Sequence, residues 1–430
     1  MKISLYNTIL PISDRTTLIY NALSDRFIAL KQPFMSLENK DILKLQEEQP
    51  VLFRQLIDIG AIIEDNTDEV QILRQRIDEV DKDDRVFHLT VNPTLDCNFN
   101  CWYCYENHQK GSMMKEDTLK SIEKFVKNTI ASIPHLESFR LSFFGGEPLM
   151  GLHIIKRLIL AAATECKAND IHFHVSFTSN AFLLNDETID FLKDYDISFQ
   201  ITLDGGKEQH DKIRFAKGGL PSYDTIIGHV KHLLTVGISV ILRINYTSET
   251  ICSVREILSI LKAIPNEYRT LLTVDLQRVW QDRRRNLDNS YTIAKHLRNE
   301  IRSMGYRVHN ARILNGVNNS CYGDKLNHLL INYNGDTFRC TARDFNSAGR
   351  TGYIKDDGSV TEDSRDAKNW MTAKFSKAVC HICRIAPLCG GGCRKQAVEH
   401  LDRLDCYYGY TSDDINDFIL ERFEERFLNQ

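Results

Sequence analysis

Cysteine spacing constrains this chain more than any other feature of its sequence. Ten of its twelve cysteines fall into two groups with short spacings. The first group is the run Cys97-x3-Cys101-x2-Cys104. The second group contains seven later cysteines: Cys321, Cys340, Cys380, Cys383, Cys389, Cys393 and Cys406. Thiolates gathered by short loops bind a soft metal ion or an iron–sulfur cluster. Cys166 and Cys252 lie outside both groups and are predicted to be ordinary buried thiols.

Composition and the N-terminus favour a cytoplasmic, globular protein. The hydrophobic content is 42% and the charged content 26%, as in soluble domains. A net charge of -4 gives no reason to expect nucleic acid as a partner. The N-terminus lacks a secretory signal, and no apolar run approaches the roughly 20 residues that span a membrane. In the cytoplasm thiols stay reduced, so these cysteines are expected to be ligands rather than disulfides.

At 430 residues the chain is too long for one core, and we expect several domains. Residues 1–85 are predicted to form a small α+β module, winged-helix-like in its pattern. Short apolar runs separated by turns indicate strands, and 3.6-residue periodicity indicates helices. The expected strands are 3–10, 17–22 and 27–30, the expected helices 42–45 and 51–59, and residues 64–85 a linker helix.

Residues 86–308 alternate strand and helix patterns. Six such units in series predict a parallel α/β sheet, curved into a partial (β/α)6 TIM-like barrel. The expected strands are 86–91, 139–144, 171–177, 197–203, 238–245 and 271–279. The expected helices include 114–130, 154–163 and 251–264.

Polar motifs follow these strands at their C-terminal ends. Because sites in parallel α/β folds are built at that edge of the sheet, the motifs predict one shared pocket. In chain order they are Cys97–Cys104, Gly145-Gly146-Glu147-Pro148, Thr178-Ser179-Asn180, Asp204-Gly205, Asn245 and Gln277-Arg278.

From residue 309 the alternation stops. Residues 309–410 are rich in Gly, Asn and Cys and have little to build a core from, so bound metal is expected to hold them. Residues 411–430 are predicted to contain a final helix at 412–428. A basic run at residues 283–285 is interpreted as a solvated loop.

Three cysteines on one loop can each reach a different iron of a cubane cluster. Three protein ligands leave one iron open to an external molecule, as three-ligand zinc sites do in enzymes. The alternative is a zinc site completed by a distant residue. Zinc sites favour x2 spacing in both cysteine pairs, and this loop has x3 and x2.

The Cys97–Cys104 spacing, with an aromatic residue before the last cysteine and the GGEP run at 145–148, resembles the radical S-adenosylmethionine (SAM) superfamily. The seven later cysteines are similar to the SPASM extension of its peptide- and protein-modifying members. A third agreement is the LDG run followed by His210, Asp211 and Arg214. Thr202, where the family usually has Ser, is a minor departure.

The resemblance implies a [4Fe–4S] cluster on Cys97, Cys101 and Cys104 whose open iron binds SAM. Backbone groups of Gly145 and Gly146 and the Glu147 carboxylate, in the run that ends at Pro148, would hold the SAM ammonium. The remaining cofactor-binding residues would be Ser179, Asn180, Asn245 and Gln277. The aromatic residues Phe99, Trp102 and Tyr103 would shield the cluster.

The resemblance also implies two auxiliary [4Fe–4S] clusters, which makes three in all. Cys380, Cys383, Cys389 and Cys406 would bind one, and Cys321, Cys340 and Cys393 the other. The second of these has only three cysteines. Its fourth position is expected to be an open iron or a ligand such as Asp324 or His328, and a purely structural or electron-transfer role is the alternative.

The N-terminal module resembles the leader-recognition modules of ribosomal peptide maturases, although a plain cap on the barrel is the alternative. The expected function is modification of a ribosomally made precursor peptide with a leader, through hydrogen abstraction and cross-linking. A flavodoxin- or ferredoxin-type protein would be the external one-electron reductant.

Several other functions stay open. A peptide epimerase would need a hydrogen donor, and neither Cys166 nor Cys252 is an obvious one. A sulfatase-maturase-like oxidase is disfavoured because Thr341 stands where those enzymes carry a catalytic Asp, although Arg343 or Asp344 could substitute. A small-molecule enzyme of the superfamily would not need the N-terminal module. From another class, the chain could be an iron–sulfur electron-transfer protein.

Overall fold

The computed structural model describes residues 1–31, 34, 37–282, 289–309, 316–342, 345–346, 349–362 and 365–427, without the side chains of 365 and 366. The basic run 283–285, Arg343 and Asp344 lie outside the described residues. So does residue 428, the predicted end of the last helix.

The chain forms two compact units, each made of segments that are distant in sequence. The first comprises Met1–Asp83, Arg312–Leu326 and Lys368–Gln430, and the second comprises Asp84–Ala311 and Asn327–Ala367. The boundaries predicted at residues 85, 308 and 410 stay predictions, and the two units are described separately below.

The second unit contains an eleven-stranded sheet in the order β12-β11-β10-β9-β8-β7-β6-β13-β14-β15-β16. The first eight strands in this order are parallel, and β14 to β16 are antiparallel. The bounds are β6 Val86–Val91, β7 Ser138–Phe143, β8 His172–Ser179, β9 Asp196–Leu203, β10 Ser239–Tyr246, β11 Leu272–Arg278, β12 Arg307–His309, β13 His328–Ile331, β14 Asp336–Phe338, β15 Gly352–Ile354 and β16 Val360–Glu362.

The predicted α/β partial barrel is confirmed, and each of its six strands lies close to its expected position. The sequence pattern did not indicate that β13 joins the same sheet. Residues 328–331 pair in parallel with β6, with His328 opposite His88 and Ile331 opposite Val91. That pairing joins segments about 240 residues apart, which no local pattern records.

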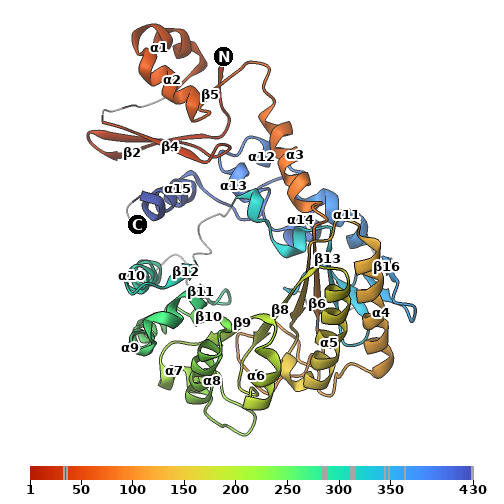
Figure 1. The fold of residues 1–430 in the computed structure, drawn as a ribbon. Helices are drawn as coiled ribbons and strands as arrows, with labels where there is room; N and C mark the ends of the chain where they lie inside the picture. Colours follow the sequence, from red (N-terminus) through yellow and green to blue (C-terminus); the bar gives the residue numbers. More distant parts are fainter. Residues whose placement is uncertain are drawn as a thin grey trace. The chain divides into compact units, whose positions relative to one another are not determined.

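Helices connect the parallel strands and cover the outside of the sheet (Figure 1). The predicted amphipathic segments 114–130 and 154–163 correspond to α4 and α5, and 251–264 divides into η3 and α9. The bounds are α4 Glu116–Ser132, η2 Pro148–Gly151, α5 Leu152–Ala168, α6 Asp186–Leu192, α7 Lys207–Ile213, α8 Tyr223–Thr235, η3 Ile251–Glu256, α9 Ile257–Ala263, η4 Asn266–Leu271 and α10 Ser290–Ser303.

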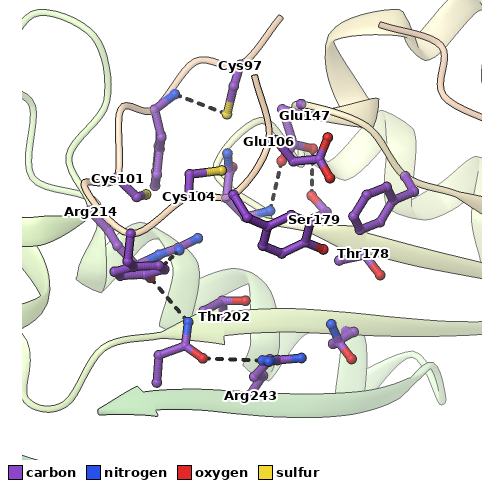
Figure 2. A pocket seen from close by; sticks show the side chains of 18 of the residues that line it. Cys97, Cys101, Cys104, Glu106, Glu147, Thr178, Ser179, Thr202, Arg214 and Arg243 are labelled. Carbon is purple, nitrogen blue, oxygen red and sulfur yellow. Dashed lines mark hydrogen bonds between the residues drawn. The ribbon is translucent and has the colours of Figure 1, made fainter. Parts of the chain in front are cut away.

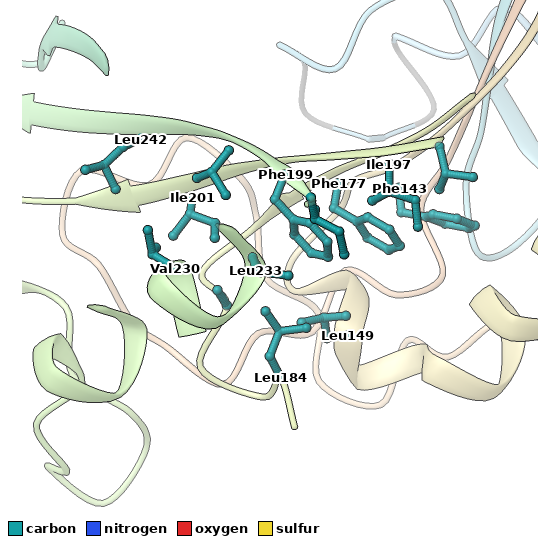
Figure 3. Packing of buried hydrophobic residues seen from close by; sticks show 14 of the residues in the cluster. Phe143, Leu149, Phe177, Leu184, Ile197, Phe199, Ile201, Val230, Leu233 and Leu242 are labelled. Atoms are coloured by element: carbon teal, nitrogen blue, oxygen red, sulfur yellow. The ribbon is translucent and has the colours of Figure 1, made fainter. Parts of the chain in front are cut away.

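The core of this unit lies between the helices and one face of the sheet (Figure 3). Alternate strand residues supply it because successive side chains in a strand point to opposite faces. Phe143, Phe177 and Phe199 from three neighbouring strands stack, with ring centroids 5.2 and 4.5 Å apart. Stacked aromatic pairs contribute about 0.5–1.5 kcal/mol each beyond their buried area.

The other face of the sheet, the inner face of the partial barrel, is polar. Its central residues are half-buried and include Ser142, Ser176, Ser198, Gln200 and Thr202. Closed barrels fill this face with bulky branched side chains. A polar, partly exposed inner face is what a barrel that receives a substrate would need.

The first unit contains the N-terminal sheet and most of the cysteine-rich segment. A three-stranded antiparallel sheet has the order β2-β3-β4, and β1 pairs with β5. The elements are β1 Lys2–Ile3, β2 Asn7–Ser13, β3 Thr16–Asn21, β4 Arg26–Leu30, η1 Asn39–Asp41, α1 Ile42–Glu48, α2 Pro50–Asp58, β5 Ile62–Ile63, α3 Glu69–Asp81, η5 Val317–Asn319, η6 Tyr322–Asp324, α11 Arg365–Ala373, α12 Ala378–His381, α13 Ala386–Cys389, α14 Arg394–Glu399 and α15 Ser412–Phe427.

One core of the first unit joins the two ends of the chain. Leu18 and Tyr20 from β3 pack in the same buried cluster as Leu388 and Ile419 from the C-terminal region. The expected linker helix is α3, and its buried Leu73 belongs to this cluster too. Among the described helices of both units, none has the length and apolarity to cross a membrane.

A buried network of four charges lies within the first unit. The Asp81 carboxylate is 2.5 Å from Arg394 Nη2, and the Asp324 carboxylate is 2.8 Å from Lys374 Nζ. Cross pairs at 3.4 and 3.5 Å complete the network. All four side chains are at most 7% exposed. The network holds two negative and two positive charges, so each buried ion has partners of opposite sign. An isolated buried ion would be strongly unfavourable.

Candidate active site

The loop after β6 carries the first cysteine group, and Asp96 holds its shape. The Asp96 carboxylate accepts hydrogen bonds from the backbone N–H groups of Cys97 at 2.8 Å and Gly111 at 3.2 Å. It also pairs with Lys217 Nζ at 3.0 Å. These bonds close the loop on itself, so that Cys97, Cys101 and Cys104 all line one cavity of about 220 Å³.

Burial keeps the three thiols protonated in the absence of metal, so a bound cluster would have to displace their protons. Burial raises the pKa of Cys97 to about 12 and that of Cys104 to about 11, and it also raises the pKa of Cys101. Thiolates are the form that binds iron, and a bound metal removes their protons. Among the residues that the structure describes, no group of three or more His, Cys, Asp or Glu side chains is placed to hold a metal ion. The fit to a cluster therefore rests on three thiols from one short loop that open into one cavity.

The GGEP run follows β7 and packs directly on the cysteine loop. Gly146 N–H donates to Thr94 O at 3.1 Å, and Glu147 N–H donates to Asp96 O at 2.9 Å. A Cβ on Gly145 would lie 2.3 Å from Thr94 O, and one on Gly146 would lie 2.1 Å from Asp96 O. The glycines are needed because the backbone of the cysteine loop approaches them closely.

We expect Gly146→Ala to displace the cysteine loop and reduce SAM binding at least tenfold, since its new methyl group would overlap a backbone carbonyl that cannot move freely. Equilibrium dialysis of SAM against the reconstituted protein measures this. Gly228→Ala in α8 is the matched control, because a Cβ there meets nothing within 4 Å and alanine favours a helix. Equal SAM affinity in the two variants would contradict the assigned role of Gly146.

Glu147 is buried and connects the GGEP run to the C-terminal end of β8 through hydrogen bonds. Its carboxylate accepts hydrogen bonds from Ser179 Oγ at 2.7 Å, Asn180 N–H at 2.8 Å and Leu149 N–H at 3.1 Å. Burial raises the pKa of Glu147, and these three donors oppose that rise by favouring the charged form. Most of the acceptor capacity of the carboxylate is thus used within the protein.

A second polar network is centred on Tyr103, on the cysteine loop. The Tyr103 hydroxyl lies 2.6 and 2.8 Å from the two oxygens of Asp204, and it accepts hydrogen bonds from Arg214 at 2.9 Å and Asn245 at 3.2 Å. Burial raises the pKa of Asp204 to about 6. Arg243 donates to the Asn245 side chain at 3.2 Å, so two residues of β10 belong to the network.

The LDG run and the residues His210 and Arg214 that follow it are joined by local hydrogen bonds. His210 is buried; it accepts from Asp204 N–H at 3.2 Å and lies 2.9 Å from Ser222 Oγ. Ser222 Oγ in turn donates to the Arg214 carbonyl. Burial lowers the pKa of His210 to about 2, so its ring is neutral at pH 7. The motif therefore fixes the segment that carries Arg214 beside the cavity.

Figure 2 shows how these side chains converge on the cavity. Of the eight predicted cofactor-binding residues, six line it: Gly145, Gly146, Glu147, Ser179, Asn180 and Asn245. Pro148 and Gln277 are not among the lining residues. Pro148 begins the 3-10 helix η2, and the Gln277 amide donates to Asp275 at 2.8 Å.

Sequence reasoning missed three lining residues on the strands, namely Gln200, Thr202 and Arg243, whereas Thr178 belongs to a motif that was predicted to lie in the pocket. The signal available was alternation, since each follows or precedes a core-facing apolar residue. Among the aromatic residues expected to shield a cluster, Phe99 and Tyr103 line the cavity. Trp102 is 58% exposed and does not line it.

In the first unit, four of the later cysteines influence one another electrostatically. Burial, together with the charges of Cys383, Cys380 and Cys406, raises the pKa of Cys389 to about 12. Burial and the same neighbours raise the pKa of Cys380 to about 11. These four thiols are the ones predicted to share a cluster, but among the described residues no group of three or more such side chains is placed to hold a metal ion. The cluster itself stays a prediction.

The other predicted trio is divided between the units. Cys321 is exposed and Cys393 half-buried in the first unit, while Cys340 is buried in the second, where Ala342 N–H lies 3.3 Å from its sulfur. Their assignment to one cluster stays a prediction. Cys166 is buried in α5 as expected, but Cys252 is exposed on η3, so its predicted burial was wrong.

The two proposed extra ligands have other partners. Asp324 belongs to the buried four-charge network, where both of its oxygens face cations. His328 is buried on β13 with Nε2 3.3 Å from Thr90 Oγ1, and burial lowers its pKa. Using either as an iron ligand would require these contacts to be given up.

The three-cysteine loop, the glycine-rich turn and the cavity thus lie together at the C-terminal edge of the partial barrel. In agreement, residues 91–261 match the family described as the Radical SAM superfamily. The chain carries a radical SAM domain, a family whose members bind a [4Fe–4S] cluster and SAM, and the described residues fit that pair.

Individual relatives match mainly this domain. An uncharacterized protein of Methanocaldococcus jannaschii is 31% identical over 148 residues, which is 34% of this chain and 48% of that protein. The radical SAM cyclopropyl synthase TigE of Paramaledivibacter caminithermalis is 24% identical over 186 residues, 39% of this chain and 38% of its own length. The chain thus spans less than half the length of these curated relatives.

Solved structures share the fold over more of the chain. The structure of anSMEcpe with bound AdoMet and Kp18Cys peptide has a TM-score of 0.62 at 18% identity and covers 80% of this chain and all of its own. SuiB of Streptococcus suis, bound to its precursor peptide SuiA, has a TM-score of 0.54 at 15% identity and covers 96% of this chain and 99% of its own.

Proposed function

We propose that this protein is a radical SAM maturase that modifies a ribosomally made precursor peptide by forming an intramolecular cross-link. One observation carries the proposal. The three thiols of the Cys97–Cys104 loop, the GGEP turn and Arg214 line a single cavity at the C-terminal edge of a parallel sheet. Such a cavity would bring an open cluster iron, SAM and a substrate within reach of one another.

The chain's own residues would position the cofactors. Cys97, Cys101 and Cys104 would hold the cluster, and the Gly145 and Gly146 backbone with Glu147 would face the SAM ammonium. Arg214, fixed by His210 and Tyr103, is a cation available for the SAM carboxylate. When bound and reduced, the cluster and SAM supply the 5′-deoxyadenosyl radical that abstracts a substrate hydrogen.

A peptide substrate is supported by the structural neighbours and by the N-terminal sheet. The anSMEcpe and SuiB structures were both solved with a peptide bound. In the first unit, β2 and β4 are the edge strands of the three-stranded sheet. An edge strand can accept a leader as an added strand through main-chain hydrogen bonds. The N-terminal module would therefore recognise the leader.

Cross-linking is favoured over the alternatives by the residues near the cavity. Thr341 cannot act as the base that a carboxylate provides in the sulfatase maturases. An epimerase needs a hydrogen donor beside the substrate radical, and neither the buried Cys166 nor the exposed Cys252 is among the described residues that line the cavity. The later cysteines would bind two auxiliary clusters that carry away the second electron. The reaction would run in the cytoplasm with a flavodoxin- or ferredoxin-type reductant.

The test uses the protein reconstituted with iron and sulfide without oxygen, together with SAM, dithionite and the short peptide encoded beside its gene. We expect 5′-deoxyadenosine and a peptide whose mass is lower by two hydrogen atoms. An unchanged mass with an inverted residue would indicate an epimerase. No 5′-deoxyadenosine at all would indicate an electron-transfer protein and overturn the proposal.

A further inference from the structure

One row of inner-face residues continues from the cavity to the open edge of the barrel. Strand pairing sets Thr202 on β9 opposite Arg243 on β10, Arg243 opposite Asp275 on β11, and Asp275 opposite His309 on β12. Thr202 and Arg243 line the cavity (Figure 2). Since neighbouring strands are about 4.8 Å apart, His309 lies two strands, or roughly 10 Å, beyond Arg243 on the same face.

His309 and Asp275 form a pair in which the carboxylate is buried and the imidazole is accessible. Nδ1 of His309 lies 3.1 Å from the Asp275 carboxylate, whose side chain is 6% exposed while that of His309 is 49% exposed. The Gln277 amide donates to the same oxygen of Asp275 at 2.8 Å. If Nδ1–H donates to Asp275, Nε2 keeps its lone pair for a proton.

Alternation on β12 sets the direction in which His309 points. Val308 packs against the buried core of the barrel, so Arg307 and His309 face the opposite, inner side. The charged groups near His309 are Asp275 on its neighbouring strand, Arg243 on β10 and Arg298 on α10. The hydrogen bond to Asp275 raises the pKa of His309, and burial and the two arginines oppose this rise.

We propose that His309, oriented by Asp275, accepts the proton that the peptide nucleophile loses when the cross-link forms. This inference rests on the proposed function and assigns a base to it. Histidine–carboxylate pairs act in this way because the carboxylate fixes the ring and stabilises the imidazolium that forms. The row from Arg243 to His309 would then be the wall along which the modified segment of the peptide lies.

A substrate C–H bond breaks and its hydrogen atom goes to the 5′-deoxyadenosyl radical. The nucleophile's S–H, N–H or O–H bond breaks heterolytically, and its proton goes to Nε2 of His309. The new bond joins that heteroatom to carbon, and the one surplus electron passes to an oxidised iron–sulfur cluster. Hydrogen abstraction itself does not require His309, so the two events can be measured separately.

A second pair on the same face provides a matched control. His174 Nδ1 lies 3.0 Å from Asp196, but this Asp begins β9 and lies at the end of the sheet away from the cavity. Here the carboxylate is 54% exposed and the imidazole 25% exposed, the reverse of the His309 pair. If any histidine–carboxylate pair on this face supported cross-linking, substitution of His174 and of His309 would slow it equally.

The experiment compares His309→Gln, Asp275→Asn and His174→Gln in the full-length, reconstituted protein with SAM, dithionite and the precursor peptide. For His309→Gln we expect cross-linking to slow by about 10²- to 10⁴-fold, the usual contribution of a general base, while 5′-deoxyadenosine still forms. Added imidazole should restore part of the cross-linking. His174→Gln should match the wild type in both products.

The pH dependence of cross-linking distinguishes a base at His309 from a purely structural role of this residue. Neutral His309 is the active form, so wild-type cross-linking should rise as pH increases through its pKa, within the imidazole range of about pH 5 to 8. Asp275→Asn removes the group that raises this pKa, so the rise should move to lower pH. Without peptide, the pH dependence of His309 modification by diethyl pyrocarbonate, read by mass spectrometry, should shift in the same direction.

The assignment would be overturned if His309→Gln formed the cross-link at the wild-type rate. It would also be overturned if the rates of cross-linking and of 5′-deoxyadenosine formation fell by the same factor. A pyrocarbonate profile of His309 that is identical in wild type and Asp275→Asn would overturn it too. A wild-type protein that forms no 5′-deoxyadenosine would instead overturn the proposed function. Failure of the inference and failure of the function are therefore distinguishable.

Discussion

Cys101→Ala should abolish reductive cleavage of SAM. Cys101 is the middle cysteine of the loop and lines the cavity together with Cys97 and Cys104. Two cysteines cannot hold three irons of a cubane while leaving the fourth for SAM. The protein should lose up to about four irons per chain, which is one cluster, and 5′-deoxyadenosine should fall below detection. Iron analysis and chromatography of anaerobic reactions measure both.

Cys252→Ala is the control for this experiment. Cys252 is an exposed thiol on η3 outside both cysteine groups, so its removal should change neither iron content nor SAM cleavage. If Cys101→Ala kept a full complement of iron and still produced 5′-deoxyadenosine, the loop at Cys97–Cys104 would not be the SAM-cleaving centre. The whole functional proposal would then have to be abandoned.

Asp81→Asn should lower the free energy of unfolding of the first unit by about 3–5 kcal/mol, the usual cost of removing one partner from a buried ion pair. Asp81 ends α3, is 2% exposed, and faces Arg394 at 2.5 Å and Lys374 at 3.5 Å. The amide keeps the size of the carboxylate but leaves an excess positive charge in the interior. Urea denaturation followed by tryptophan fluorescence reports this, because Trp370 is buried beside the network and its carbonyl accepts from Arg394 at 3.1 Å.

Asp78→Asn, one turn earlier in α3, is the matched control. Asp78 pairs with Lys82 at 2.8 Å, but both side chains are more than half exposed. Exposed pairs contribute about 0–1 kcal/mol, so this variant should remain close to the wild type. Equal urea midpoints for the two variants would show that the buried network does not hold α3 against the cysteine-rich segment.

The accuracy of the sequence predictions varied with the range of the interactions behind them. Each of the six barrel strands was predicted because hydrophobic alternation is local, and the GGEP turn was located because its residue types are unusual. Residues 328–331 were placed outside the barrel because their pairing with β6 depends on a segment far away in the chain. Gln277 was expected in the cavity from its strand end, but its amide binds Asp275 instead.

The sequence by itself was enough to predict a metal-binding loop, because the spacing of three thiols on one short segment is a local property. It also determined the order of strands and helices in the barrel, through their periodicity. Only the tertiary structure decided which side chains meet. Glu147 contacts Ser179, Tyr103 contacts Asp204, and Asp275 contacts His309 across 32, 101 and 34 residues. Sheet register brings Asp275 and His309 together, and the packing of loops at the strand ends brings the other two pairs together. Both are properties of the packed fold rather than of any one segment.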